Sequence, residues 1–391
     1  VWLCSGQSNM AFRVDESVAE EIASHHDYVS ACKSPKIRLY NMKPRYMTTN
    51  EEWDSTALAN VNALQYYDVE GWMEATHDAV NEFSAVGFSF GRSVVDSLHV
   101  PVGLICNAVG GSPLEAWIDR NTLETEIPDI LYEPATNDML QPWVRERAAK
   151  NVAKSDNRFQ RHPYHPAYLY ETGMAPLEGF PMRGLIWYQG ESNAHNAELF
   201  SRLFPMFVDC IKQNLMIDGG VHFVQLTSMD RPSWPVFRNT QRRLADSLPR
   251  VDMAVIHDLG DSLDVHPRRK QEVGRRLALL ALQDEGWQVE ASGPVPVKAY
   301  NAGDAVIVEF SHAMGLTTSD GAMPVTFELA RYDGLYYPAT AKIDEAGRVS
   351  LVADGVERPR FVRYAWQPYT RANVVNGAGL PLSTFQMPVS Q

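Results

Sequence analysis

The sequence predicts an α/β protein with a mostly parallel sheet wrapped on both faces by helices in three layers, followed by a small antiparallel β module. Short apolar runs alternate with helical patterns through the first three-quarters of the 391 residues. Because these runs are continuously apolar, we expect strands buried on both faces, and strand-helix alternation is typical of a helix-covered parallel sheet. Near Gln288 the pattern changes to short strands and turns. We therefore expect one domain over residues 1–288 and a β module over residues 289–391.

Five apolar runs and three helical patterns define the expected first domain. The strands are predicted over residues 1–4, 102–107, 184–188, 221–226 and 251–256. The helices are predicted over residues 85–98, 197–214 and 267–282, the last beginning with a proline, which the first helical position tolerates. Residues 32–71 show little periodicity and are expected to form a long surface insertion.

The C-terminal module is predicted from five short β-rich runs. They cover residues 305–310, 325–332, 335–342, 349–353 and 361–366. Asp333-Gly334 between two of them is typical of a tight hairpin turn.

Composition excludes several classes of function. The net charge of −13 argues against a nucleic-acid partner, since phosphates require a basic surface. No apolar run is long enough to span a bilayer. The four cysteines, Cys4, Cys32, Cys106 and Cys210, form no CxxC pair, and His162 with His165 lacks a third ligand in the sequence, so neither a metal nor another cofactor is expected. The chain starts with Val inside a predicted strand, which suggests a processed or truncated piece.

Polar residues follow the predicted strands at the points where each strand ends. Ser8 comes just after the first strand, behind Gly6, where a hydroxyl is exposed and held in place as a nucleophile requires. Gly110-Gly111 follows the second strand, and two glycines can direct a backbone N–H at a developing oxyanion. Each feature alone is more typical of an ordinary turn.

Two further segments complete this pattern. Gln189, Glu191 and Asn193 follow the third strand, where amides can complete an oxyanion hole and a carboxylate can orient a histidine. His266 follows the fifth strand, with Asp264 two residues before it. Functional residues collect at the carboxyl ends of parallel strands, so the four segments together indicate a serine hydrolase.

These segments resemble the conserved blocks of a known family. Residues 6–10 (GQSNM), 110–117 (GGSPLEAW), 187–194 (WYQGESNA) and 264–267 (DVHP) are similar to those of sialate O-acetylesterases, which are SGNH hydrolases close to the family 6 carbohydrate esterases. Residues 165–177 and parts of the C-terminal module extend the resemblance over most of the chain. The resemblance implies an SGNH fold, which is flavodoxin-like, and an exported or lysosomal protein.

Residue by residue, the resemblance implies a nucleophile, a base and an oxyanion hole. Ser8 matches the nucleophile, His266 the base, and Gly111 the glycine whose N–H joins that of Ser8 in the oxyanion hole. An ungapped placement of the third strand puts Glu191 near the position of the family's asparagine, whereas donor chemistry favours Gln189 or Asn193. We prefer Gln189 as the oxyanion donor because an ionised carboxylate cannot donate, and we assign Asn193 to substrate binding.

The acid that orients His266 has three candidate solutions. SGNH enzymes place an aspartate three residues before the histidine, where this chain has Leu263. Asp264 is the local substitute, and Glu191 is the rival. In the third arrangement a backbone carbonyl orients the histidine and no acid is needed.

Two other features compete with this assignment. Residues 87–91 (GFSFG) fit the Gly-x-Ser-x-Gly pattern, but they lie in a predicted helix rather than at a strand-to-helix elbow. His257 ends the fifth strand but lacks the helix-start context of His266.

The resulting hypothesis is a metal-independent esterase that removes O-acetyl groups from sialic acids through an acetyl-enzyme. The alternatives are an acetylxylan or other neutral-glycan acetylesterase, and a carbohydrate-binding protein without catalysis. A sialic acid carboxylate would require a facing Arg or Lys. The sequence does not indicate which one, and Arg13 is only close to Ser8 in sequence.

Overall fold

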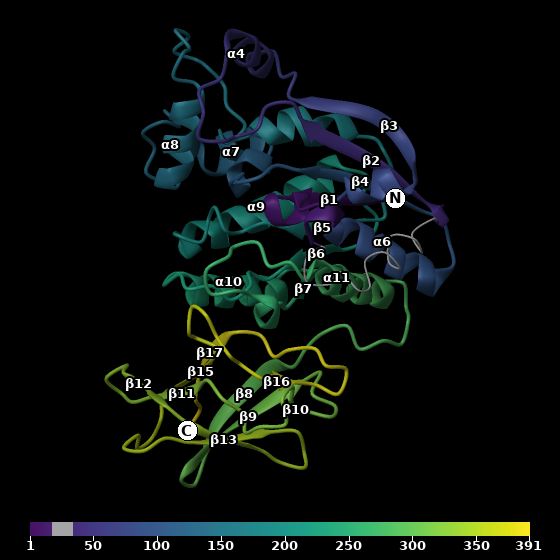
Figure 1. Ribbon diagram of the computed structural model, residues 1–391. Helices are drawn as coiled ribbons and strands as arrows, with labels where there is room; N and C mark the ends of the chain where they lie inside the picture. Colours follow the sequence, from purple (N-terminus) through teal and green to yellow (C-terminus); the bar gives the residue numbers. More distant parts are fainter. Residues whose placement is uncertain (18–33) are drawn as a thin grey trace. The chain divides into compact units, whose positions relative to one another are not determined.

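The computed structural model describes residues 1–17 and 34–391, which divide into two compact units (Figure 1). Unit 1 comprises Val1–Phe223, Leu248–Asp252 and Arg268–Ala281. Unit 2 comprises Val224–Ser247, Met253–Pro267 and Leu282–Gln391. No helix in the described residues is long and apolar enough to cross a membrane.

A seven-stranded sheet forms the centre of the α/β part, in the order β3-β2-β4-β1-β5-β6-β7. The strands are β1 (Trp2–Gly6), β2 (Ser34–Pro44), β3 (Tyr67–Ala75), β4 (Val102–Ala108), β5 (Gly184–Tyr188), β6 (Val221–Val224) and β7 (Val251–Ala254). Strands β2, β4, β1, β5 and β6 pair in parallel, and β3 is an antiparallel edge strand. The mostly parallel sheet predicted from the sequence is confirmed.

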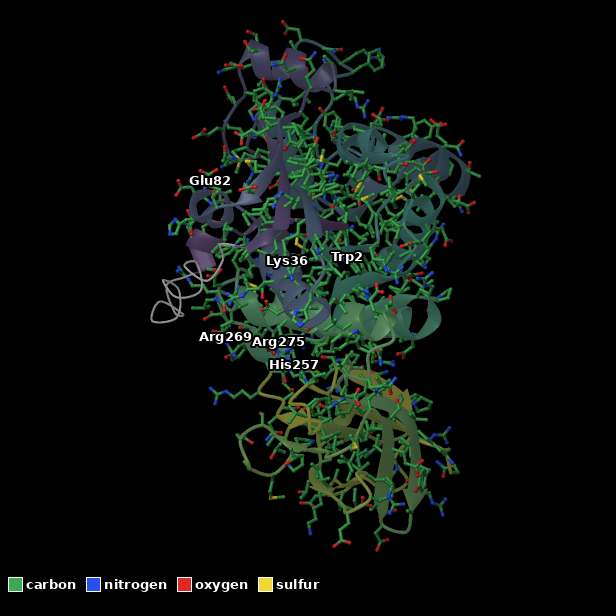
Figure 2. All side chains as sticks on the ribbon, turned by 90° about the vertical axis from the view of Figure 1, so that its right-hand side faces the viewer. Trp2, Lys36, Glu82, His257, Arg269 and Arg275 are labelled. Atoms are coloured by element: carbon green, nitrogen blue, oxygen red, sulfur yellow. The ribbon has the colours of Figure 1, made fainter. Side chains whose placement is uncertain are left out.

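Helices cover both faces of this sheet. Successive side chains of a strand point to opposite faces of the sheet, so Trp2 and Ser5 of β1 face opposite ways. Trp187 of β5 is in register with Ser5, so its side chain lies on the face opposite that of Trp2. Helix α6 (Ala85–Leu98) packs on the first face through Phe90, whose ring centroid lies 4.9 Å from that of Trp2. Helix α9 (Ala197–Asn214) packs on the second through Phe207, 4.3 Å from Trp187. Trp2 is consequently 5% exposed, within the packed interior (Figure 2).

The five predicted strands and three predicted helices are all present. Helices α6 and α9 have the predicted bounds, whereas α11 (Lys270–Asp284) begins three residues after Pro267, which is therefore not its first residue. Helix α10 (Trp234–Ser247) was not predicted. Its buried face includes Arg238 and Gln241 beside Trp234, Phe237 and Leu244, and the two polar residues interrupt the apolar stripe that identifies a helix.

The prediction of a surface insertion over residues 32–71 is wrong for the described part, which begins at residue 34. This part forms β2, helix α4 (Ser55–Asn62) and the start of β3, and β2 is a parallel neighbour of β4. The signal was weak because β3 is an edge strand with mostly exposed side chains. Few positions therefore had to be apolar.

The C-terminal strands in unit 2 form antiparallel sheets, as predicted. One has the order β12-β11-β15-β17, another has the order β13-β14-β9-β8, and β10 pairs with β16. Their bounds are β8 Val295–Ala302, β9 Ala305–Ser311, β10 Thr317–Thr318, β11 Phe327–Ala330, β12 Tyr336–Pro338, β13 Thr340–Ile343, β14 Val349–Val352, β15 Phe361–Tyr364, β16 Val374–Val375 and β17 Phe385–Pro388. The run at 335–342 is two strands in different sheets, and β8, β10, β16 and β17 were not predicted. The boundary after residue 288 stays a prediction.

The predicted turn at Asp333-Gly334 joins β11 to β12, and Gly334 has a φ of +79°. A non-glycine residue rarely adopts this conformation, which explains why the dipeptide identified the hairpin.

Candidate active site

Three segments of the predicted site meet at the carboxyl ends of the central parallel strands in unit 1. Strand β1 lies between β4 and β5, with Gly6 opposite both Ala108 and Tyr188. The three strands are parallel and end level with one another, so the residues that follow them converge. The chain first forms strands on one side of β1 (β2 and β4) and then strands on the other side (β5 and β6). The carboxyl ends of these strands therefore lie at a topological switch point, the usual ligand site of such sheets.

Gly6 allows the chain to turn sharply into the nucleophile segment. Its φ is +141°, and a Cβ there would lie 2.1 Å from the Tyr188 carbonyl oxygen. The Gln7 N–H donates to that same oxygen at 2.9 Å. Ser8 follows as the first residue of the short helix α1 (Ser8–Ala11) and is half-buried.

The glycine pair after β4 lies beside Ser8. A Cβ on Gly110 would be 3.7 Å from the Ser8 Cβ, which is van der Waals contact. Gly111 has a φ of +73°, and a Cβ there would lie 2.3 Å from the Tyr164 hydroxyl oxygen. That hydroxyl donates to the Gly110 carbonyl at 2.7 Å. The structure therefore brings the predicted nucleophile and the predicted oxyanion glycines together.

Two residues that the sequence did not single out connect these segments to the one after β5. The Gln7 Oε1 accepts from the N–H groups of Gly190 at 3.3 Å and Ser192 at 3.4 Å. The Ser192 hydroxyl donates to the Gly111 carbonyl at 2.9 Å. Their polar side chains within turns carry no signal that distinguishes this role from turn formation.

Gln189 and Asn193 both bind groups of the protein. The Gln189 Nε2 donates to Asn193 Oδ1 at 2.7 Å and to the Ser112 carbonyl at 3.3 Å. The Asn193 Nδ2 donates to Glu115 Oε2 at 2.9 Å. The roles assigned to them, oxyanion donor for Gln189 and substrate contact for Asn193, stay predictions. In this structure both amides support the loop that carries Gly111.

Glu115 is a buried acid that the sequence did not indicate. It belongs to a single 3₁₀ turn (Leu114–Trp117) and is 1% exposed. Burial raises the pKa of its carboxyl to about 7, although a backbone hydrogen bond and Asn193 oppose the shift.

Glu191 contacts Asn9, the residue that follows the predicted nucleophile Ser8. The Asn9 Nδ2 donates to Glu191 Oε1 at 2.5 Å, and the Lys270 ammonium donates to Asn9 Oδ1. Burial raises the pKa of Glu191, while a backbone hydrogen bond, Asn9 and the Lys270 charge act against that rise.

His266 and Asp264 belong to unit 2. The Asp264 Oδ1 accepts from the His266 backbone N–H at 2.8 Å and lies 3.8 Å from the imidazole Nδ1. The second distance is that of an ion pair and too long for a hydrogen bond. Asp264 thus contacts His266 despite its spacing of two residues, while the pairing of His266 with Ser8 and the choice of Asp264 or Glu191 stay predictions.

The competing features have structural roles. Ser89 lies inside α6 and donates to the Gln271 carbonyl at 2.7 Å, so residues 87–91 form no nucleophile elbow. His257 is buried in unit 2, with its Nε2 2.8 Å from the Leu382 carbonyl. Arg13 pairs with Asp15 at 3.0 Å. Cys4, Cys106 and Cys210 are buried free thiols, and Cys32 lies outside the described residues.

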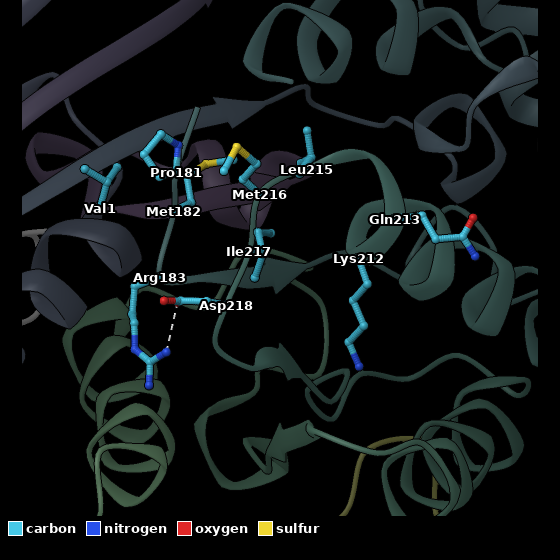
Figure 3. A pocket seen from close by; sticks show the side chains of 10 residues that line it. All are labelled: Val1, Pro181, Met182, Arg183, Lys212, Gln213, Leu215, Met216, Ile217 and Asp218. Carbon is cyan, nitrogen blue, oxygen red and sulfur yellow. Dashed lines mark hydrogen bonds and ion pairs between the residues drawn. The ribbon is translucent and has the colours of Figure 1, made fainter. Parts of the chain in front are cut away.

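A cavity of about 640 Å³ lies elsewhere in unit 1 (Figure 3). Val1 and Arg183, which line it, directly precede β1 and β5, so the cavity is at the amino ends of the strands. Arg183 pairs there with Asp218 at 2.9 Å. Since the Ser8 segment follows the carboxyl ends, this cavity is separate from the candidate site.

The sequence profile of one family matches residues 1–141 and 148–283, which is most of the chain. That family is described as carbohydrate esterases, sialic acid-specific acetylesterase. The chain belongs to this family. The matched residues include Ser8, Gly111, Glu191 and His266, so the resemblance seen in the sequence is confirmed.

Named relatives agree with this membership. The chain is 28% identical to the sialate O-acetylesterase of Rattus norvegicus and to that of Homo sapiens, in each case over 76% of this chain. It spans 59% of the length of the rat protein and 56% of the human one. A solved carbohydrate acetylesterase from Xanthomonas citri is 27% identical, with a TM-score of 0.78 over 99% of this chain and 80% of that one.

Proposed function

We propose that the chain is a carbohydrate O-acetylesterase that works through a serine acetyl-enzyme. The observation that carries the proposal is the closeness of Ser8 to the Gly110–Gly111 turn at the switch point of the sheet, where a Cβ on Gly110 would lie 3.7 Å from that of Ser8. A nucleophile directly beside a glycine turn with left-handed backbone is the arrangement that acyl transfer requires. Membership of the acetylesterase family supports the choice of an acetyl ester.

The reaction proceeds in two steps, acetylation of Ser8 and hydrolysis of the acetyl-enzyme. The Ser8 hydroxyl attacks the acetyl carbonyl while His266 accepts its proton, and the oxyanion is stabilised by the Ser8 and Gly111 N–H groups. The bond to the sugar oxygen breaks, His266 returns the proton to that oxygen, and the acetyl group stays on Ser8. Water then attacks the acetyl-enzyme with His266 as base, releasing acetate and restoring Ser8.

One observation supports His266 as the base. Asp264 is 3.8 Å from its Nδ1, so a carboxylate is in place to stabilise an imidazolium.

For the substrate we propose O-acetylated sialic acid, supported by the names of the rat and human relatives. A neutral acetylated glycan such as acetylxylan is the alternative within the same chemistry. The family relationship also supports an exported or lysosomal location.

The test combines a variant with a substrate panel. Ser8→Ala should lower acetyl-ester hydrolysis roughly 10⁴-fold or more, whereas Ser89→Ala, in the buried Gly-x-Ser-x-Gly segment, should retain it. Full activity in Ser8→Ala would exclude a serine mechanism through this residue. Exclusive release of acetate from xylooligosaccharides, and none from acetylated sialic acids, would reject the sialate assignment.

A further inference from the structure

Lys270 is a buried cation close to the nucleophile segment. It is the first residue of α11 and is 0% exposed. Its ammonium lies 4.8 Å from the ring centroid of Phe12 and 5.6 Å from that of Tyr188. An ammonium withdrawn from water is strongly destabilising unless other groups compensate its charge. A lysine in this position therefore indicates a specific role.

The compensating groups form a chain through Asn9. Lys270 donates to Asn9 Oδ1, and Asn9 Nδ2 donates to Glu191 Oε1 at 2.5 Å. The amide of Asn9, itself 0% exposed, thus connects a cation on α11 with a carboxylate that follows β5. Both ends of the amide are held, which fixes its plane.

We infer that Lys270 and Glu191 are positioning residues that clamp Asn9 from both sides and thereby fix the adjoining Ser8 for attack. This inference rests on the proposed function. Helix α1 has only four residues, so its own hydrogen bonds hold Ser8 weakly. A side-chain clamp on the next residue supplies the missing rigidity, and near-attack geometry depends on shifts of about 1 Å.

The clamp requires opposite charges at its two ends. The titratable groups that face Glu191 within the described part of unit 1 are Lys270 on α11 and the Tyr188 phenol at the end of β5. Burial works against ionisation of Glu191, and the Lys270 charge favours it. Removing Lys270 should therefore move the protonation of Glu191 to higher pH.

The experiment is a double-mutant cycle with Lys270→Met, Glu191→Gln and both together. We measure kcat and KM with p-nitrophenyl acetate from pH 5 to 9, and Tm for each variant. Either single variant should lower kcat about 100-fold with little change in KM, and the double variant should be no slower than the slower single variant. The acid limb of the Lys270→Met profile should shift to higher pH.

Lys43→Met and Glu82→Gln form the matched control. Their ion pair is also in unit 1, at 2.8 Å, but both side chains are substantially exposed. These variants and their combination should keep the wild-type kcat and acid limb.

Two results would overturn the inference. Wild-type kcat and pH profile in both single variants would leave Lys270 with a structural role only, even if Tm falls. Losses of kcat that multiply in the double variant would show independent effects instead of a clamp. If Lys270→Met does not fold, Glu191→Gln, which keeps the side-chain shape, decides alone through its kcat. Failure of the proposed function would give a different result, because acetyl-ester hydrolysis would then persist in the Ser8→Ala variant.

Discussion

The Asp264 carboxylate binds the His266 backbone N–H at 2.8 Å and stays 3.8 Å from the imidazole Nδ1. The backbone hydrogen bond holds the carboxylate beside the ring, at a distance too long for a direct hydrogen bond to Nδ1. Spacing alone had left open whether an aspartate two residues away could reach the ring at all. The contact shows that Asp264 can reach the ring, and the choice between Asp264 and Glu191 as the acid for His266 stays a prediction.

Asp264→Asn should lower kcat on the order of 100-fold. The effect should be smaller than the ~10⁴-fold loss of a triad whose aspartate binds the histidine directly, because an ion pair at 3.8 Å in partly exposed surroundings is weaker. Steady-state kinetics with an acetyl ester would measure it. Combining Asp264→Asn with Glu191→Gln should multiply the two losses, since one acts at His266 and the other at Ser8. An Asp264→Asn enzyme with wild-type kcat would return the assignment to Glu191 or to a dyad.

Gly111→Ala should impair both folding stability and catalysis. At a φ of +73° a Cβ would meet the Tyr164 hydroxyl at 2.3 Å, so the free energy of unfolding should fall by about 1–3 kcal/mol and the rate by roughly 100-fold. Gly110→Ala is the control for stability, since its Cβ would meet only the Ser8 Cβ at 3.7 Å and its backbone is not in the left-handed region. Chemical denaturation and acetyl-ester kinetics would measure the pair. Equal stability of the two variants would contradict the geometry at Gly111.

Stability should fall as pH rises from about 4.5 to 7 because of Glu115. Burial raises its folded-state pKa from 4.5 to about 7, so over this window the folded state binds more protons than the unfolded state. The contribution should total about 3 kcal/mol and stay constant at higher pH. Glu115→Gln should flatten this part of the profile of unfolding free energy against pH, whereas Glu124→Gln at an exposed position should not. A Glu115→Gln profile identical to that of the wild type would show that Glu115 does not titrate in this window.

Arg238→Lys should destabilise unit 2. The Arg238 guanidinium is 0% exposed and donates to the carbonyls of Thr227, Ala365, Gln367 and Pro368 and to the Thr384 hydroxyl. A lysine has three donors in place of a planar fork of five, so the free energy of unfolding should fall by about 3 kcal/mol. The exposed Arg243→Lys on the same helix is the control. Equal denaturation midpoints for the two variants would refute this role.

The sheet could be predicted because its central strands are buried on both faces and must be apolar throughout. Strand β5 and helices α6 and α9 have the bounds that their residues predict. Strands β2 and β3 were missed because strands toward the edge of a sheet bury fewer side chains, so fewer of their positions must be apolar. Helix α10 was missed because the Arg238 and Gln241 side chains on its buried face donate to backbone carbonyls, and a pattern of apolar residues cannot reveal such contacts.

The sequence by itself determined the family, the strand ends that carry Ser8, Gly111 and Glu191, and the α/β class. These features depend on local pattern and on residue types in sequence order. Only the tertiary structure decided that Gly110 lies beside Ser8, that Gln189 and Asn193 bind each other, and that Lys270 reaches Asn9 from 261 residues away. Such contacts follow from strand register and from the packing of α11, and neither can be predicted from the spacing of residues along the chain.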